Sequence, residues 1–261
     1  MLTSTRNERV QAVRRLHRRP ARVAERRFVV EGPQAVREAL LHGTLLELYA
    51  VDQHDPLAVQ AAGLGIEVVA VDTKVLEALA QTRTPQGLVG VAPLLDTDLS
   101  TALTAAPRLV TVLHEVADPG NAGTVIRTSD AAGAGAVVLT GDSVDPHNGK
   151  CVRATAGSLW HLPVVAHASL ETVLTELRRT GLQVLATTAA GEDDLDDLAD
   201  SGVLARPTAW LLGSEAHGLP ATALDGADRR VRIPMPGRAE SLNLATAAAV
   251  CVFASARALR R

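Results

Sequence analysis

The sequence predicts an α/β protein with two parts: a larger C-terminal domain built on a parallel sheet and a smaller α/β domain before it. After residue 108, continuous apolar strands alternate with helical segments, which is typical of parallel sheets covered on both faces. The 261 residues exceed one domain of about 150 residues but fall short of two. Hydrophobic residues make up 47% of the chain, enough for a proper core, so a disordered chain is excluded.

The first part of the chain is expected to form a small α/β unit. Residues 1–27 predict one or two short polar helices, and an apolar strand follows at 28–30. Gly32 and Pro33 then turn the chain into a helix over 34–41. Further strands are expected at 45–51, 65–71 and 88–91, and a further helix at 75–79.

The second part predicts the repeating strand and helix pattern. Strands are expected at 109–113, 136–140, 164–165, 183–188 and 209–212, and helices at 122–132, 170–180 and 242–260. The acidic run 192–197 has no metal-loop spacing, so we expect a solvated loop or a helix start there. We therefore divide the chain into a basic N-terminal arm (1–27), a small α/β domain (28–93), a linker (94–107) and a larger α/β domain (108–261).

The charge of the chain is distributed unevenly. The net charge is only −3, yet residues 1–27 hold nine arginines and two glutamates, a net +7, which leaves −10 for the rest. A basic end on an acidic body is expected where that end meets phosphate, although a solvated helix face would look the same. We expect contacts with nucleic-acid phosphates from the nine arginines of this segment: Arg6, Arg9, Arg14, Arg15, Arg18, Arg19, Arg22, Arg26 and Arg27.

Several classes of protein are excluded by what the sequence lacks. No apolar run is long enough to cross a bilayer, and the first residues lack an apolar signal core, so we expect a cytoplasmic protein. Cys151 and Cys251 lie far apart without CxxC spacing, so we expect neither a disulfide framework nor a metal site. The P-loop, GxSxG and HExxH motifs are absent, and 2% aromatic residues argue against a base-stacking platform.

Three polar segments of the second part each follow an apolar strand. The first is N-x-G-x-x-x-R at 121–127, where a Pro-Gly-Asn turn opens a helix whose free N–H groups suit an anion. The second is G-S-E-x-x-G-L at 213–219, a strand that ends in a carboxylate flanked by glycines. The third is I-P-M-x-G at 233–237 with S-L-N at 241–243, where proline leaves carbonyls and apolar edges to hold a flat ring.

These three motifs, in this order, resemble those of the SpoU/TrmH family of RNA ribose 2′-O-methyltransferases, in the SPOUT superfamily. Residues 28–40 and the Pro85-Gln86-Gly87 turn are similar to the small RNA-binding domain of the family's ribosomal-RNA members and actinomycete antibiotic-resistance enzymes, which itself resembles a ribosomal protein. One departure is Ser214, where many members carry asparagine before the glutamate.

The resemblance implies a trefoil-knotted α/β domain that binds S-adenosylmethionine and forms a homodimer through the knotted face. The alanine content of the 242–260 helix suits close packing at such an interface, although an ordinary buried helix would look the same. The resemblance places the cofactor against Thr187, Gly213, Ile233, Met235, Ser241 and Leu242. It places the catalytic group at Asn121, Arg127, Glu215, Ser241 and Asn243. The implied activity is methylation of a ribose 2′-hydroxyl, with 23S ribosomal RNA favoured over transfer RNA because of the extra N-terminal domain.

The expected chemistry assigns a role to each catalytic residue. The protein need mainly align an activated methyl group with the 2′-oxygen and help remove its proton. An arginine has a pKa above about 12 and no acceptor when charged, so we expect Arg127 to bind phosphate and stabilise the developing alkoxide. Asn243 and Ser241 would orient the ribose, and Glu215 would hold the loops and Arg127. A non-catalytic RNA-binding homologue is the alternative from another class; housekeeping and resistance roles both remain open.

Overall fold

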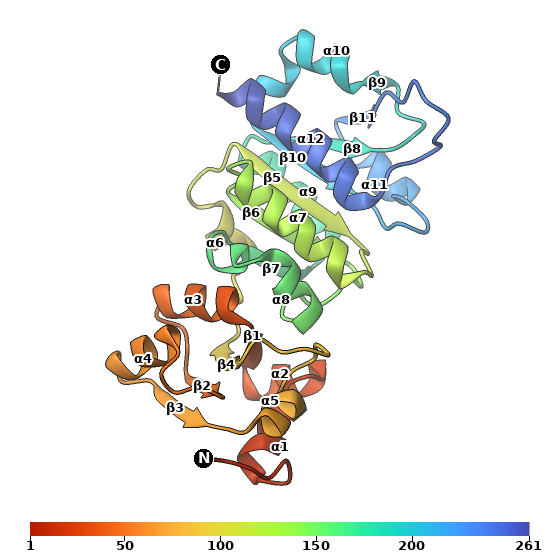
Figure 1. Ribbon diagram of the computed structural model, residues 1–261. Helices are drawn as coiled ribbons and strands as arrows, with labels where there is room; N and C mark the ends of the chain where they lie inside the picture. The colour runs from red at the N-terminus through yellow and green to blue at the C-terminus, as the bar shows by residue number, and fades with distance from the viewer. Residues whose placement is uncertain (261) are drawn as a thin grey trace. The chain divides into compact units, whose positions relative to one another are not determined.

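The chain folds into two compact units in the computed structural model, which describes residues 1–260 (Figure 1). The N-terminal unit comprises Met1–Leu95 together with His147–Trp160. The C-terminal unit comprises Asp96–Pro146 and the chain from His161 onward. The division after Leu95 lies inside the stretch expected to be a linker, 94–107, but most of that stretch is no linker, because residues 99–103 form a helix that buries Ala102 and Leu103 in the core of the C-terminal unit. The return of residues 147–160 to the first unit had no signal in the sequence.

The N-terminal unit is built on a four-stranded mixed sheet in the order β1-β4-β2-β3. Its strands are β1 (Arg27–Glu31), β2 (Glu47–Ala50), β3 (Glu67–Ala70) and β4 (Leu88–Pro93). Its helices are α1 (Glu8–Arg15), α2 (Arg19–Glu25), α3 (Pro33–Leu41), α4 (Pro56–Gly63), α5 (Thr73–Leu79) and α8 (Gly149–Thr155). Strands β2 and β3 run parallel, whereas β4 is antiparallel to both of its neighbours. The strands expected in the first part are confirmed, and α4 is an addition.

Residues 1–27 belong to the core of this unit. Helix α1 buries Val10 and Val13 against α5, in one apolar cluster with Tyr49, Val75 and Leu79. The predicted polar helices are therefore confirmed, but one face of α1 is apolar and packed. This segment does not stand apart as an arm.

The second chain segment of the N-terminal unit, residues 147–160, packs on β1. The His147 ring lies 4.8 Å from the Phe28 ring, and Nε2 of His147 accepts the Leu95 N–H at 3.0 Å. Trp160 donates its ring N–H to the Thr44 hydroxyl at 2.9 Å. Residues far along the chain thus complete the core beside Phe28.

The C-terminal unit contains a seven-stranded sheet in the order β7-β6-β5-β10-β8-β11-β9, and every pairing in it is parallel. Its strands are β5 (Leu109–His114), β6 (Ala136–Thr140), β7 (Val164–Ala168), β8 (Gln183–Thr187), β9 (Asp193–Asp194), β10 (Thr208–Leu212) and β11 (Arg229–Arg232). Its helices are α6 (Leu99–Leu103), α7 (Pro119–Ala131), α9 (Leu170–Arg179), α10 (Leu195–Asp200), α11 (Ala221–Asp225) and α12 (Leu244–Leu259). The predicted parallel sheet is confirmed.

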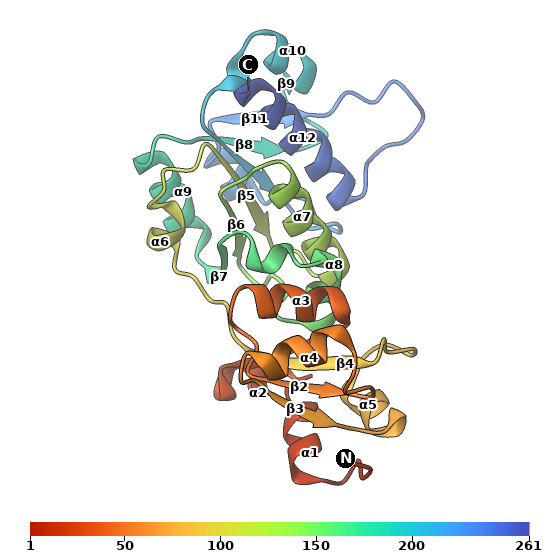
Figure 2. The same ribbon diagram turned by 60° about the vertical axis from the view of Figure 1, so that its left-hand side comes forward.

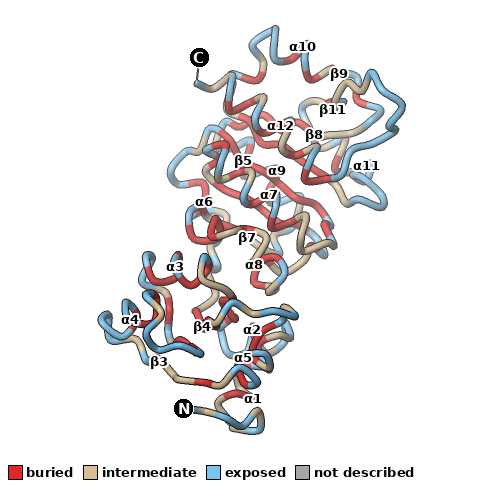
Figure 3. Tube along the Cα trace, in the orientation of Figure 1, coloured by how far each residue is buried: buried red, intermediate tan, exposed pale blue. Residues whose placement is uncertain are grey.

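Burial explains why the strands of this sheet read as unbroken apolar runs. Strands β5, β6 and β10 are buried at every position, because helices cover both faces of the sheet (Figures 2 and 3). The short β9 and β11 carry charged residues instead, which is why no apolar run predicted them. Arg229 pairs there with Asp193 at 3.0 Å, and Arg232 with Asp194 at 3.2 Å.

The boundaries of two elements follow from side-chain caps. The Asn243 side chain accepts the N–H groups of Ala245 and Thr246, so α12 begins at Leu244 rather than at Leu242 as predicted. The Asp194 side chain caps α10, which confirms the predicted helix start in the acidic run. No helix within residues 1–260 is both long and apolar enough to cross a membrane.

Candidate active site

A pocket of about 550 Å³ lies at the carboxyl ends of β8, β10 and β11 in the C-terminal unit. Ligand sites of α/β proteins form at this edge of the sheet, and 300–1,000 Å³ is the usual size range. The pocket is lined by all six residues expected to bind the cofactor: Thr187, Gly213, Ile233, Met235, Ser241 and Leu242. The structure thus brings together residues from three separate strand ends.

The 213–219 loop forms one wall of this pocket and is tightly folded on itself. A Cβ added at Gly213 would overlap backbone atoms of Gly218 and Leu219, so only glycine fits there. The Ser214 hydroxyl accepts the His217 N–H at 3.3 Å, and the Ser214 carbonyl accepts the Gly218 N–H at 2.9 Å. The serine that departs from the family pattern therefore closes the turn that presents Glu215.

A directed chain of side-chain hydrogen bonds runs along the rim of the pocket. Asn243 uses its oxygen to cap α12, which leaves its amide N–H to donate to the Asn121 oxygen at 3.2 Å. The Asn121 amide in turn donates to Oε1 of Glu215 at 2.6 Å. The direction of both amides is fixed by the helix N–H groups at one end and the carboxylate at the other. The chain joins three of the five predicted catalytic residues.

Arg127 lies apart from this hydrogen-bonded chain. It is exposed on α7, six residues after Asn121, and among residues 1–260 its side chain forms no ion pair. The expectation that Glu215 holds Arg127 is wrong for a single chain, because Glu215 accepts from Asn121 instead. The six residue steps from Asn121 to Arg127 span about 9 Å along the axis of α7, so Arg127 lies well away from Glu215, which is bonded to Asn121. Ser241, the fifth predicted residue, lines the pocket.

Sequence reasoning missed Glu240, which also lines the pocket. Its only signal was its place directly before Ser241 in a motif already singled out. Cys251, in contrast, is buried on α12, and desolvation raises the pKa of its thiol to about 12. It is therefore an inert core residue and no nucleophile.

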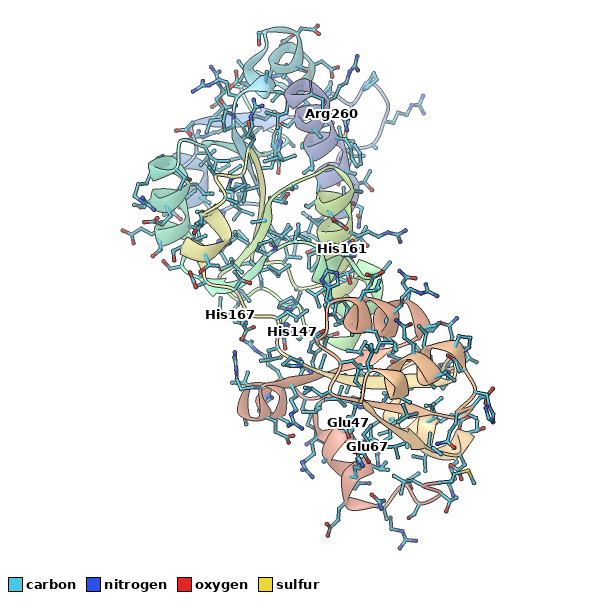
Figure 4. The ribbon with its side chains drawn as sticks, turned by 90° about the vertical axis from the view of Figure 1, so that its left-hand side faces the viewer. Glu47, Glu67, His147, His161, His167 and Arg260 are labelled. Carbon is cyan, nitrogen blue, oxygen red and sulfur yellow. The ribbon has the colours of Figure 1, made fainter. Side chains whose placement is uncertain are left out.

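Two of the nine arginines predicted to contact RNA are part of the fold instead. Arg9 bonds Glu47 and Glu67, each at 2.6 Å, and these two glutamates lie close together in Figure 4. Its bond to Glu67 and the second one to Glu47 hold the pKa of Arg9 well above its usual value. Arg22 is 3% exposed and donates to the Leu16 and His17 carbonyls. Their charge is thus used within the fold.

The other seven predicted arginines are exposed. Arg15 lies 3.8 Å from Glu25, a loose surface pair. Six more sit on the surface of the N-terminal unit: Arg6, Arg14, Arg18, Arg19, Arg26 and Arg27. Exposure at the end of a long side chain is what a phosphate contact requires, and their contact with RNA stays a prediction.

The pocket fits S-adenosylmethionine by the chemistry of its lining. Ile233, Met235 and Leu242 supply apolar surface for a flat ring, and proline at 234 and 236 leaves carbonyls without competing donors there. Glu215 and Glu240 add carboxylates that suit a positively charged ligand. An apolar wall with few polar groups is the common design of such sites.

Comparison with protein families places both units. Residues 108–253 match the model of the SpoU rRNA methylase family, and residues 7–90 match an MRM3-like substrate-binding domain. The chain is 34% identical to the Bacillus subtilis 23S rRNA (guanosine(2553)-2′-O)-methyltransferase RlmP, over 97% of both chains. The second match covers the basic segment from residue 7, in keeping with its packing in the N-terminal unit.

Two solved structures are similar over nearly the whole chain. An AdoMet-bound rRNA methyltransferase from Sinorhizobium meliloti shares 33% identity with a TM-score of 0.84, covering 98% of this chain and 97% of that one. The SpoU methyltransferase AviRb from Streptomyces viridochromogenes, in complex with AdoMet, shares 28% identity with a TM-score of 0.86, over 97% and 98%. The expected fold class, a trefoil-knotted SPOUT domain with a small α/β domain before it, is confirmed.

Proposed function

Because the chain belongs to the SpoU rRNA methylase family, whose methyl donor is S-adenosylmethionine, we propose that it methylates a ribose 2′-hydroxyl of 23S ribosomal RNA. The observation that carries the proposal is the position of Glu215. Its carboxylate lines the pocket predicted to hold the cofactor and is held by Asn121 at 2.6 Å. A methyl donor bound in this pocket would therefore lie beside a proton acceptor.

The reaction requires alignment and one proton transfer. S-adenosylmethionine, when bound, supplies a methyl group on a positively charged sulfur. When the carbon–sulfur bond breaks, the sulfur keeps the electron pair and becomes a neutral thioether. The residues of the chain then have to hold the ribose so that its 2′-oxygen faces that methyl group. We assign this to Ser241 and Asn243, which line the pocket beside Glu215.

Glu215 is the group we assign to the proton of the hydroxyl. Oε1 accepts from Asn121, so Oε2 is left to accept from the ribose. A carboxylate accepts only, and a fixed amide on its other oxygen gives it a single orientation. The exposed guanidinium of Arg127 would bind a phosphate of the same RNA, because its fork matches phosphate oxygens.

We propose that the active form is a homodimer through α12 and α7. Val250 and Phe253 are three residues apart on α12 and are 39% and 43% exposed. Residues at this spacing share a helix face, and α12 packs beside α7, the helix of Arg127. A second copy covering this face would bury two large apolar side chains. It would also bring Arg127 of one copy toward the second copy, so that two copies could share one active site.

The N-terminal unit favours ribosomal RNA over transfer RNA. Its match to a substrate-binding domain covers residues 7–90, about a third of the chain. Transfer RNA stays the alternative within the same chemistry, and a non-catalytic RNA-binding protein is the alternative outside it. All five predicted catalytic residues are present, which argues against the latter.

The test is transfer of labelled methyl from S-adenosylmethionine to purified 23S rRNA, 16S rRNA and bulk tRNA. Modified riboses are mapped by their resistance to alkaline cleavage. We expect label in 23S rRNA at one protected linkage. Label in tRNA alone would overturn 23S rRNA as the substrate but would support methyl transfer as the reaction. Cofactor binding without transfer to any RNA, including partly assembled large subunits, would overturn the enzymatic proposal.

A further inference from the structure

The N-terminal unit contains a buried carboxylate with four donors. Glu31, at the end of β1, has a side chain 5% exposed. It accepts the N–H of Gln81 at 3.0 Å, the N–H of Thr82 at 3.2 Å and the Thr82 hydroxyl. The fourth donor is Arg153 of α8, at 2.8 Å. Burial of a carboxylate is costly unless it is paired in this way, so Glu31 binds three chain segments together.

The 81–87 loop held by Glu31 runs from the end of α5 to β4 and extends beside β4 in Figure 2. Arg83 lies in it, exposed, and within residues 1–260 it forms no side-chain hydrogen bond or ion pair. The loop is therefore fixed at its base by Glu31 while it presents a cation to solvent.

Two further segments bring cations to the same place. Nε2 of His17 lies 2.9 Å from the Leu79 carbonyl, two residues before the loop, which anchors the turn between α1 and α2 there. Arg14 and Arg18, on either side of His17, are exposed. At the start of α8, the Gln81 side chain packs against Gly149, and the exposed Lys150 follows. The negative charge of Glu31 is matched by Arg153, so the carboxylate of Glu31 does not offset these cations.

We propose that Arg14, Arg18, Arg83 and Lys150, the basic surface of the N-terminal unit, bind the phosphate backbone of the RNA substrate, and that Glu31 is the positioning residue of this surface. The proposal rests on the proposed function for the identity of the ligand. Cations from three segments without aromatic side chains among them suit phosphates rather than bases. Arg9 and Arg22, used inside the fold, are not part of it.

The first experiment compares two double variants with equal loss of charge. Arg18→Ala/Arg83→Ala removes two cations of the basic surface, and Arg37→Ala/Arg206→Ala removes two exposed arginines elsewhere, on α3 and before β10. The logarithm of RNA affinity is measured against the logarithm of salt concentration with 23S rRNA fragments. We expect the first variant to flatten the slope by about 1.4, since each single-strand phosphate contact contributes about 0.7. Equal slopes for the two variants would overturn the proposal.

The outcome is separable from that of the proposed function. If the wild-type protein binds RNA with a slope that only the first variant flattens, but transfers no methyl group, the surface stands and the enzymatic proposal falls. If methyl transfer is normal in both variants and their slopes agree, the enzyme stands and the surface falls.

The second experiment tests Glu31 as a positioning residue. Glu31→Gln keeps the size of the side chain and removes its charge. We expect faster hydrogen exchange at the Gln81 and Thr82 amides and a KM for RNA raised about tenfold, with kcat and cofactor affinity unchanged. Thr82→Val removes a single donor and gives a milder form of the same effect if Glu31→Gln does not fold. Faster exchange with an unchanged KM would show that Glu31 acts on the fold alone and would overturn its positioning role.

Discussion

The side-chain amide of Asn243 donates to the oxygen of Asn121, 122 residues earlier in the chain, at 3.2 Å. The side-chain oxygen of Asn243 accepts the first N–H groups of α12, so the start of that helix orients the Asn243 amide. That amide begins the chain of hydrogen bonds that ends at Glu215. Helix capping and active-site geometry are thereby tied to one side chain. The two functions can be separated by substitution.

Asn243→Asp keeps the capping oxygen and removes the donor to Asn121. We expect the melting temperature to stay near that of the wild type and kcat to fall about tenfold or more, the cost of a hydrogen bond near a charge. Asn243→Ala loses the cap as well, which costs about 1 kcal/mol of stability. Calorimetry and methyl transfer measure the two effects. An aspartate variant with full activity would mean that the chain of amides does not support transfer.

Glu215→Gln removes the proposed proton acceptor while preserving its shape and its bond from Asn121. We expect methyl transfer to fall by about 100-fold or more, the usual contribution of a general base. Glu171→Gln, at an exposed site on α9, is the matched control and should be neutral. Single-turnover transfer at saturating RNA is the measurement. A variant within a few-fold of wild type would exclude Glu215 as the base.

Arg127 is predicted to bind phosphate through its fork. Arg127→Ala should flatten the salt dependence of RNA affinity by about 0.7 to 0.9, the loss of one phosphate contact. Arg127→Lys keeps the charge and should restore the slope, but it should transfer the methyl group more slowly, because lysine lacks the bidentate geometry. Filter binding and initial rates separate the two effects. Full activity of the lysine variant would show that the guanidinium geometry is not needed.

Phe253→Glu tests the proposed homodimer. A charge in the middle of a buried apolar face is costly, so we expect the variant to run as a monomer in light scattering. We also expect it to lose methyl transfer, because the site would be shared between two copies. Val59→Glu changes an exposed apolar residue of α4, 55% exposed, and should alter neither property. A wild-type protein that is monomeric at micromolar concentration would contradict the proposal.

The environment of His17 predicts that the folded protein loses stability at acid pH. Burial lowers the pKa of His17 below 6.5, and the nearby Arg14 and Arg22 lower it further, while the Leu79 carbonyl and Glu31 oppose this. The unfolded chain then binds more protons than the folded one as pH falls below 6.5. Stability is thus complete above that pH and declines as pH drops toward the folded pKa. His17→Gln can donate to Leu79 without titrating, so urea unfolding at pH 8 and 5.5 should show a smaller loss than in the wild type.

The sheet of the C-terminal unit could be predicted because its strands are buried on both faces. Val110, Val112 and Leu113 are fully buried, and such strands read as apolar runs. Strand β11 escaped prediction because Arg229 and Arg232 serve in ion pairs at the edge of the sheet. An apolar pattern in the sequence indicates burial, so it cannot predict a strand that is stabilised by ion pairs.

The sequence predicted the candidate site only for residues that belong to, or lie beside, the family motifs. Thr187 and Met235 come from different strand ends, and because Thr187 lies outside the three motifs, only the family resemblance placed it beside Met235 before the structure did. The charges of residues 1–27 were less informative. Arg22 looks like its neighbours in the sequence, yet it is buried, because whether an arginine meets solvent or a carbonyl depends on distant packing.

The composition of the N-terminal unit has a consequence for synthesis. Its last pieces, among them Arg153 and Trp160, emerge from the ribosome only after the first segment of the other unit, Asp96–Pro146, has been translated. Until then Glu31 lacks its cationic partner and Phe28 lacks its aromatic neighbours. The N-terminal unit therefore finishes folding late, although most of it is translated before the C-terminal unit. A fragment cut after Leu95 would lack part of its core, so the unit cannot be exchanged between proteins as a simple cassette.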